Sequence, residues 1–115
     1  MKFTELTLKS LDNKPGYFEV AGDVYYSGSF EYVVPRGFVT DLASIPALLR
    51  PIFSRTGLSR KPAVFHDHMY SVKWKTRKRC DESFKEMLLA RGVSKGVANI
   101  YYWGVRLGGW TRGRW

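Results

Sequence analysis

The order in which two hydrophobic patterns follow each other constrains the fold of this 115-residue chain more than any other feature. The first third is rich in β-branched and aromatic residues interrupted by turn formers, which predicts strands at residues 3–9, 17–20, 24–26 and 30–34. From Ser59 onward, the apolar residues recur at helical spacing instead. We therefore predict an α+β protein with a small antiparallel sheet in its N-terminal third, followed by three helices.

The helical part contains three predicted helices, of which the first two form a hairpin. The first begins near Ser59, the second covers about residues 80–91, and the third runs from Ser94 to Gly108. A basic loop at residues 73–79 joins the first two. The positions expected to form their buried faces are Val64, Phe65, His68 and Met69, then Phe84, Met87 and Leu88, then Val97, Ile100, Tyr101 and Val105.

No repeat, linker or change of composition divides the chain, so we expect one domain over residues 1–115, with residues 110–115 as a basic aromatic tail. Residues 35–41 are predicted as a loop, with Thr40 or Asp41 capping a short helix that begins near Leu42. No apolar run is long enough to cross a bilayer, so we expect no transmembrane segment. The single cysteine, Cys80, excludes an internal disulfide.

The charge balance is strongly positive, with 19 Lys and Arg against 10 Asp and Glu, a net charge of +9. Such a field attracts phosphate-bearing partners, either lipid headgroups or nucleic acid. Cations alternate with Trp74 in one segment and with Trp110 and Trp115 in another, a pattern that suits an anionic surface, although a solvated face has the same composition. The candidate anion-binding residues are Lys73, Lys75, Arg77, Lys78, Arg79, Arg112 and Arg114, with Arg106 nearby.

The most informative chemical pattern is His66, Asp67 and Tyr70 on the first helix, together with Asp81. His66 and Tyr70 are four residues apart and therefore share one helix face. A compact turn would bring Asp81 back toward His66, where a neutral imidazole takes a proton from water and a carboxylate orients it. The alternative is structural, with His66 in the core or at a cap and Asp81 as a helix N-terminal charge.

Two resemblances follow from these motifs. Between about residues 32 and 103 the chain resembles a phage and prophage family of unknown function (DUF1353-type). That resemblance implies a phage origin but no settled activity. We expect location in the host cytoplasm or the virion, because a single cysteine gives no sign of secretion, and other phage structural proteins are candidate partners. Its motif residues are Pro35, Gly37, Phe38, Thr40, Asp41, Leu42, Ala43, Ser44, Ile45 and Pro46, then His66, Asp67 and Tyr70, then Asp81 and Phe84.

The His-Asp-x-x-Tyr segment also resembles the helix of calcium-dependent phospholipases A2. The resemblance implies that His66 activates water, that Asp67 binds calcium, and that Tyr70 and Asp81 orient the histidine. The glycine-rich calcium loop and the disulfides of those enzymes are missing here. Calcium needs six to eight oxygens, so Asp41 and loop carbonyls would have to complete the shell.

Two main function classes remain open at this stage, and a third, nucleic-acid binding without chemistry, is supported by charge alone. The first is a metal-assisted ester hydrolase with His66 as general base and an anionic lipid ester as substrate. The second is a non-enzymatic virion component, such as a tail or connector part, or a host-interaction factor, in which the histidine belongs to a structural network. Zinc is disfavoured because His66 and His68 are two residues apart and face away from each other on a helix.

Overall fold

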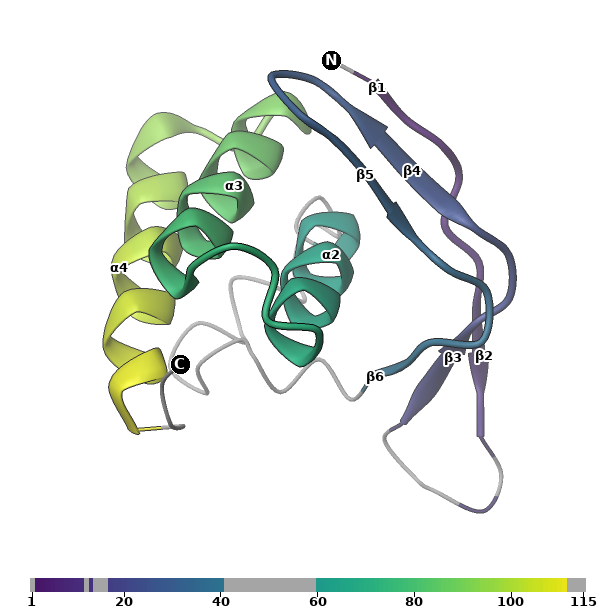
Figure 1. The fold of residues 1–115 in the computed structure, drawn as a ribbon. Coiled ribbons are helices and arrows are strands. Elements are labelled where there is room, and N and C mark those ends of the chain that lie inside the picture. The colour runs from purple at the N-terminus through teal and green to yellow at the C-terminus, as the bar shows by residue number, and fades with distance from the viewer. Residues whose placement is uncertain (1, 12, 14–16, 41–59, 112–115) are drawn as a thin grey trace. The chain divides into compact units, whose positions relative to one another are not determined.

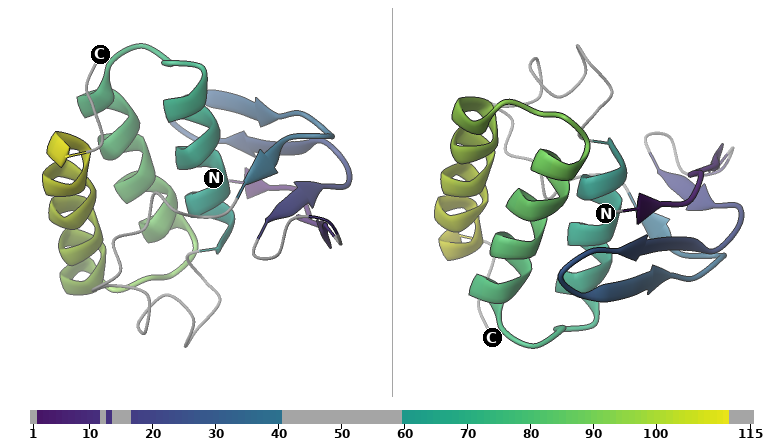
Figure 2. Two further views of the ribbon diagram at one scale, coloured as in Figure 1. Left: turned by 90° about the horizontal axis from the view of Figure 1, so that it is seen from below. Right: turned by 90° about the horizontal axis from the view of Figure 1, so that it is seen from above.

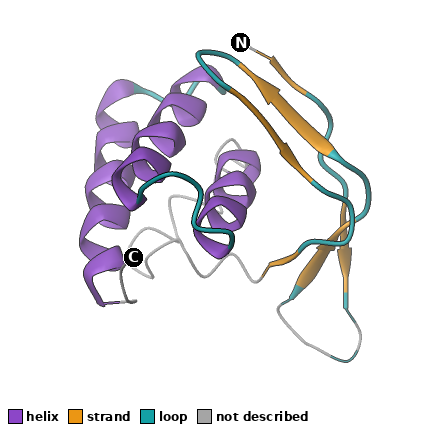
Figure 3. Ribbon diagram, in the orientation of Figure 1, coloured by secondary structure: helices purple, strands orange, loops and turns teal. Residues whose placement is uncertain are grey.

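The computed structural model describes residues 2–11, 13, 17–40 and 60–111, with side chains described for residues 3–107 of these ranges. Within them, six strands precede three helices, as Figure 3 shows. The predicted α+β class, with a small antiparallel sheet followed by helices, is confirmed. The short helix expected near Leu42 lies outside the described residues, as does Asp41.

The strands form two antiparallel sheets of three strands each, in the orders β1-β4-β5 and β2-β3-β6. The expected strand at residues 3–9 is therefore two short strands in different sheets, and β6 lies where a loop was predicted. Strands of two or three residues carry little periodicity, so pairing between distant segments defines them. The bounds are β1 (Lys2–Phe3), β2 (Leu8–Ser10), β3 (Phe18–Val20), β4 (Val24–Ser27), β5 (Glu31–Val34) and β6 (Val39–Thr40).

Strand β4 shows the alternation expected of a half-buried strand, because Val24 and Tyr26 are buried while the residues that follow each are exposed. The ring of Tyr26 packs against Phe3, with centroids 4.6 Å apart, and against Phe30, with centroids 5.0 Å apart. These contacts join the β4–β5 hairpin to β1 within the sheet.

The chain divides into two compact units, Met1–Leu42 and Ala43–Trp115. The expectation of one domain over residues 1–115 stays a prediction. The three helices in the described ranges belong to the second unit: α2 (Arg60–Ser71), α3 (Arg77–Ala90) and α4 (Lys95–Thr111). Helix α3 lies between the other two, as Figures 1 and 2 show from three directions.

The buried helix faces agree with the sequence pattern on α3 and only in part on α2 and α4, because His68 of α2 and Val97 of α4 are half-buried. The predicted residues of α3 are fully buried, as are Val64, Phe65 and Met69 of α2. On α4, however, Ile100 is 49% exposed, so its predicted place in the core was wrong. Among the side chains of α4 that the structure describes, residues 95–107, the buried ones are Ala98, Tyr101 and Val105.

Helix α3 begins earlier than predicted, because Thr76 caps it. Thr76 has an extended backbone and its Oγ1 accepts a hydrogen bond from the Arg79 amide at 3.1 Å. Residues 77–79, predicted as loop, therefore form the first turn of the helix. Helix α4 begins as expected after Ser94, but it continues past Gly108 to Thr111.

Helices α2 and α3 end in the same hydrogen-bond pattern. The Lys73 and Trp74 amides donate to the Tyr70 and Met69 carbonyls, closing α2. The amides of Gly92 and the next residue close α3 in the corresponding way. This Schellman motif needs a left-handed residue after the helix, which is Gly92 in α3 (φ 94°) but Lys73 in α2 (φ 54°).

Candidate functional site

Three polar side chains from α2 and α4 meet at Asp81 of α3, and we call His66, Tyr70, Asp81 and Arg106 the polar cluster. The carboxylate oxygen Oδ1 of Asp81 lies 2.7 Å from His66 Nε2 and 2.6 Å from the Tyr70 hydroxyl. Its Oδ2 accepts a hydrogen bond from Arg106 Nη1 at 3.0 Å. The expected hydrogen-bond distance between His66 and Asp81 is confirmed, whereas the catalytic roles of His66, Tyr70 and Asp81 stay predictions.

Helix geometry explains why three of these side chains meet. His66 and Tyr70 are one turn apart on α2, and their rings pack with centroids 4.3 Å apart. The short connection from residue 72 to Thr76 turns the chain back, so that Asp81 returns beside His66. Phe84, one turn further along α3, packs against the imidazole with centroids 4.8 Å apart.

The centre of the cluster is buried, because His66 is 1% exposed and Asp81 is 0% exposed, whereas Tyr70 and Arg106 are partly exposed. A buried carboxylate is tolerated only when its oxygens accept hydrogen bonds, and Asp81 accepts from an imidazole, a phenol and a guanidinium. Burial, and then the hydrogen bond to Asp81, raise the pKa of Tyr70 above its ordinary value of 10.0. Tyr70 therefore stays a hydrogen-bond donor at working pH.

The two nitrogens of His66 are in different environments. An ionised Asp81 can only accept, so the His66 tautomer that fits carries its proton on Nε2 and donates it to Asp81. The second nitrogen, Nδ1, is buried and has no hydrogen-bond partner among the described residues. In this tautomer, Nδ1 carries a free lone pair and is the basic atom of the ring.

Asp67, the candidate calcium ligand, follows His66 on α2 and is partly buried. Its charge acts on His68, whose pKa is lowered from 6.5 by burial and raised less strongly by Asp67. No group of three His, Cys, Asp or Glu side chains that could hold a metal ion is present in the described part of the chain. Since calcium needs several oxygens and Asp41 lies outside the described residues, the calcium site stays a prediction.

The cationic segment separates into exposed and buried residues, and we call residues 73–79 the cationic turn. Lys73, Lys75 and Lys78 are exposed, whereas Arg77 is buried and its Nε has no hydrogen-bond partner among the described residues. Trp74 is covered by cations of its own segment, with Lys75 Nζ 5.0 Å from its ring centroid. The candidates Arg112 and Arg114 lie outside the described residues.

Cys80 connects this turn to the cluster, because it lies next to Asp81 and its Sγ contacts the Trp74 carbonyl at 3.1 Å. The thiol is buried, and burial together with the neighbouring Asp81 charge raises its pKa to about 12. A thiol with so high a pKa is a poor nucleophile and a poor metal ligand.

Arg106 is the residue of the polar cluster that sequence reasoning did not place there. The sequence suggested that it belongs to the cationic surface, yet its Nη1 binds Asp81, 25 residues earlier in the chain. The available signal was its position next to the core residue Val105 on α4. Only the packing of α4 against α3, through Tyr101 and Phe84, brings Arg106 to the carboxylate.

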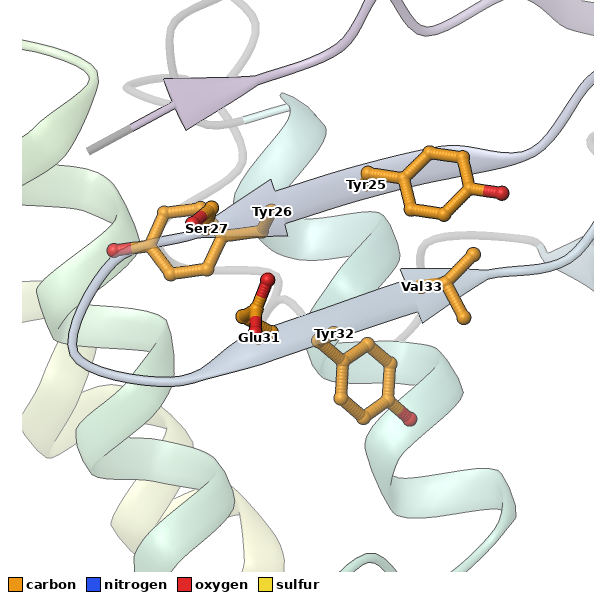
Figure 4. A pocket seen from close by; sticks show the side chains of 6 residues that line it. All are labelled: Tyr25, Tyr26, Ser27, Glu31, Tyr32 and Val33. Carbon is orange, nitrogen blue, oxygen red and sulfur yellow. The ribbon is translucent and has the colours of Figure 1, made fainter.

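A separate hollow of about 610 Å³ lies on the β4–β5 hairpin of the first unit, shown in Figure 4. Its lining contains one carboxylate, Glu31, and no histidine, cysteine or cation. The polar cluster, with its oriented imidazole, is therefore the stronger candidate for chemistry. The hollow is lined by Tyr25, Tyr26, Ser27, Glu31, Tyr32 and Val33.

Comparison with known proteins gives one family match. The model of a family described as "Protein of unknown function (DUF1353)" matches residues 18–105, which include every member of the polar cluster except Arg106. No curated protein and no solved structure shows significant similarity to the chain. No described helix is long and apolar enough to span a membrane.

Proposed function

The chain belongs to DUF1353, a family of proteins of unknown function, and we propose that it is a hydrolase that cleaves an ester bond in an anionic lipid, with His66 as general base. The observation that carries the proposal is the asymmetry of the imidazole. Its Nε2 is held by Asp81, while its Nδ1 is unpartnered among the described residues. A purely structural network would satisfy both nitrogens, since buried polar atoms are nearly always hydrogen-bonded.

The proposed reaction uses the free Nδ1. His66 Nδ1 removes a proton from a water molecule, whose oxygen forms a bond to the ester carbonyl carbon. The ester C–O bond then breaks, and the proton on Nδ1 passes to the departing alcohol oxygen. Asp81 stabilises the imidazolium formed between these steps, because its carboxylate lies 2.7 Å from Nε2.

Tyr70 and Arg106 act as positioning residues in this proposal. Tyr70 donates to the same oxygen of Asp81 as His66, and Arg106 donates to the other oxygen. Together they fix the plane of the carboxylate, so that the imidazole is held in one orientation.

Calcium belongs to the proposal through Asp67 and Asp41, which would supply carboxylate ligands. When bound, it would neutralise negative charge that develops on the carbonyl oxygen. The anionic lipid substrate is supported by the net charge of +9 and by the exposed lysines of the cationic turn.

The second candidate is a non-enzymatic phage protein, either a virion tail or connector component or a host-interaction factor in the host cytoplasm. The observation that favours it is burial, because His66 and Asp81 are 1% and 0% exposed. In that function, the polar cluster would fix the arrangement of the three helices and bind no substrate.

Substitution of the two candidate functional residues separates these functions. We expect His66→Gln to lower the rate of ester hydrolysis by about a hundredfold to ten-thousandfold while calcium binding is kept. We expect Asp67→Asn to weaken calcium binding and hydrolysis together. For each variant, the hydrolysis rate is measured with phosphatidylglycerol vesicles and with a soluble p-nitrophenyl ester. Calcium binding is measured by calorimetric titration, and a melting curve shows whether the variant is folded.

His68→Gln is the matched control, because it makes the same change two residues along α2, outside the polar cluster. We expect it to leave the hydrolysis rate within about twofold of the parent. A parent protein that hydrolyses neither substrate, with an Asp67→Asn variant that binds calcium as the parent does, would reject the hydrolase in favour of the non-enzymatic protein.

A further inference from the structure

Helix α4 carries large apolar side chains on the face opposite to its core contacts. Ile100, Trp103 and Leu107 are 49%, 61% and 67% exposed. They are spaced by three and four residues, so they form one continuous stripe along the helix, which we call the outer α4 stripe. The opposite face, with Tyr101 and Val105, is buried in the helical unit.

This stripe is unusual for a surface helix, whose exposed face normally carries polar residues. An exposed hydrophobic residue by itself needs no explanation, but a contiguous stripe of three large ones marks an interaction surface. The buried face of α4 already has its partner within the helical unit, because Tyr101 packs against Phe84 of α3 with ring centroids 6.0 Å apart. The outer α4 stripe is therefore available for another partner.

The charges in the stretch of sequence that includes α4 indicate the class of partner. From residue 87 to residue 115 the chain has five cationic side chains and no carboxylate side chain. A second copy would bring another net charge of +9 against this surface, which opposes self-association. A nucleic acid would gain little from the aliphatic side chains of Ile100 and Leu107, because protein–nucleic acid contacts rely on charges, hydrogen bonds and aromatic stacking.

We propose that the outer α4 stripe docks the protein on an anionic lipid bilayer, with α4 lying in the plane of the interface. Apolar side chains on one side, a Trp among them and flanking cations without acidic residues are the pattern of helices that bind such interfaces. This inference rests on the proposed function for its purpose, which is to bring the enzyme to a lipid substrate. Vesicle binding itself requires no turnover.

The same helix joins this surface to the polar cluster. Arg106, which binds Asp81 Oδ2, directly precedes Leu107 of the stripe. A helix held at the bilayer by its outer face would therefore keep the polar cluster within one helix diameter of the lipid headgroups.

The test is vesicle co-sedimentation of the full chain with phosphatidylglycerol and with phosphatidylcholine vesicles. We expect the parent to bind the anionic vesicles more tightly, and the triple variant Ile100→Gln, Trp103→Gln and Leu107→Gln to bind them at least about tenfold more weakly. The control variant Val72→Gln, Leu89→Gln removes two other exposed apolar side chains of the same unit, 55% and 40% exposed, and should bind as the parent does. Melting curves establish that each variant is folded.

A second measurement locates the contact. Lipids with brominated acyl chains should quench the tryptophan fluorescence of the parent, and Trp103→Phe should lose more of that quenching than Trp74→Phe, since Trp74 is covered by its own lysine. Equal vesicle binding by the parent and the triple variant would overturn the docking surface. So would a parent that binds only DNA, or one that is a dimer and becomes a monomer in the triple variant.

These outcomes are distinct from failure of the proposed function. Stripe-dependent binding to vesicles without any hydrolysis would keep the docking surface and reject the hydrolase. Hydrolysis of the soluble ester without binding to vesicles would keep the hydrolase and reject the docking surface.

Discussion

The polar cluster and the cationic turn are neighbours in sequence, yet they use charge in opposite ways. In the polar cluster, Asp81 is completely buried and accepts three hydrogen bonds at 2.6–3.0 Å. In the cationic turn, Lys73, Lys75 and Lys78 are exposed to solvent. The difference teaches that burial and pairing, rather than charge itself, decide how much a charged residue contributes to stability.

Removing the central carboxylate should give the largest effect. We expect Asp81→Ala to lower the free energy of unfolding by about 3–5 kcal/mol, because it leaves Arg106 and the His66 Nε2 proton without their acceptor. Urea denaturation followed by circular dichroism measures the change. A loss below about 1 kcal/mol would mean that the carboxylate is not buried and paired as described.

Removing one of the hydrogen-bond donors to Asp81 should lower the free energy of unfolding less than removing Asp81 itself. We expect Tyr70→Phe to lower the free energy of unfolding by about 1–3 kcal/mol, because Asp81 Oδ1 loses a buried hydrogen bond while the ring packing on His66 is kept. The same denaturation measurement applies. The double variant Tyr70→Phe, Asp81→Ala should be little less stable than Asp81→Ala alone, since the two residues share one interaction.

In the cationic turn, backbone conformation should affect the free energy of unfolding more than charge does. We expect Lys73→Gly to raise the free energy of unfolding by about 1 kcal/mol, because it relieves a left-handed lysine at the end of α2. The matched change Gly92→Ala, at the equivalent position of α3, should lower it by a similar amount. Lys78→Gln removes a charge without a conformational change, and its effect should stay within about 0.5 kcal/mol.

The smallest expected effect concerns pH and His68. Burial lowers the pKa of His68 below 6.5 in the folded protein, so below pH 6.5 the unfolded chain binds a proton more readily than the folded one. Stability should therefore fall as the pH decreases through 6.5 and level off below the folded pKa. Denaturation curves between about pH 8 and about pH 5 should show a weaker decline in His68→Gln than in the parent.

The sequence alone predicted the parts of the polar cluster that depend on local geometry. The spacing of His66 and Tyr70 predicts that they share one helix face. It also predicts that Asp81 lies beside His66, provided that the turn between the two helices is compact. The start of α3 was misplaced because the cap formed by Thr76 went unrecognised among the surrounding cations. The local signal for Arg106, its position next to Val105, did not identify Asp81 as its partner, because that contact depends on how α4 packs.

The errors elsewhere have a similar origin. The apolar spacing predicts Ile100 in the core because it implies a helix with one apolar face, whereas α4 has two. Strand β6 and the division into two sheets depend on pairing between distant segments, such as Phe18 with Thr40. Local periodicity describes a single element and carries no information on such partners.

The buried position of Cys80 makes the reactivity of its thiol a measure of local opening of the structure. Its thiol lies between the turn, where Sγ contacts the Trp74 carbonyl, and the carboxylate of the next residue. A buried thiol with a pKa of about 12 reacts with a disulfide reagent only when the surrounding structure opens. Because the chain has a single cysteine, the rate of thiol modification in the folded protein measures how often the structure around Cys80 opens.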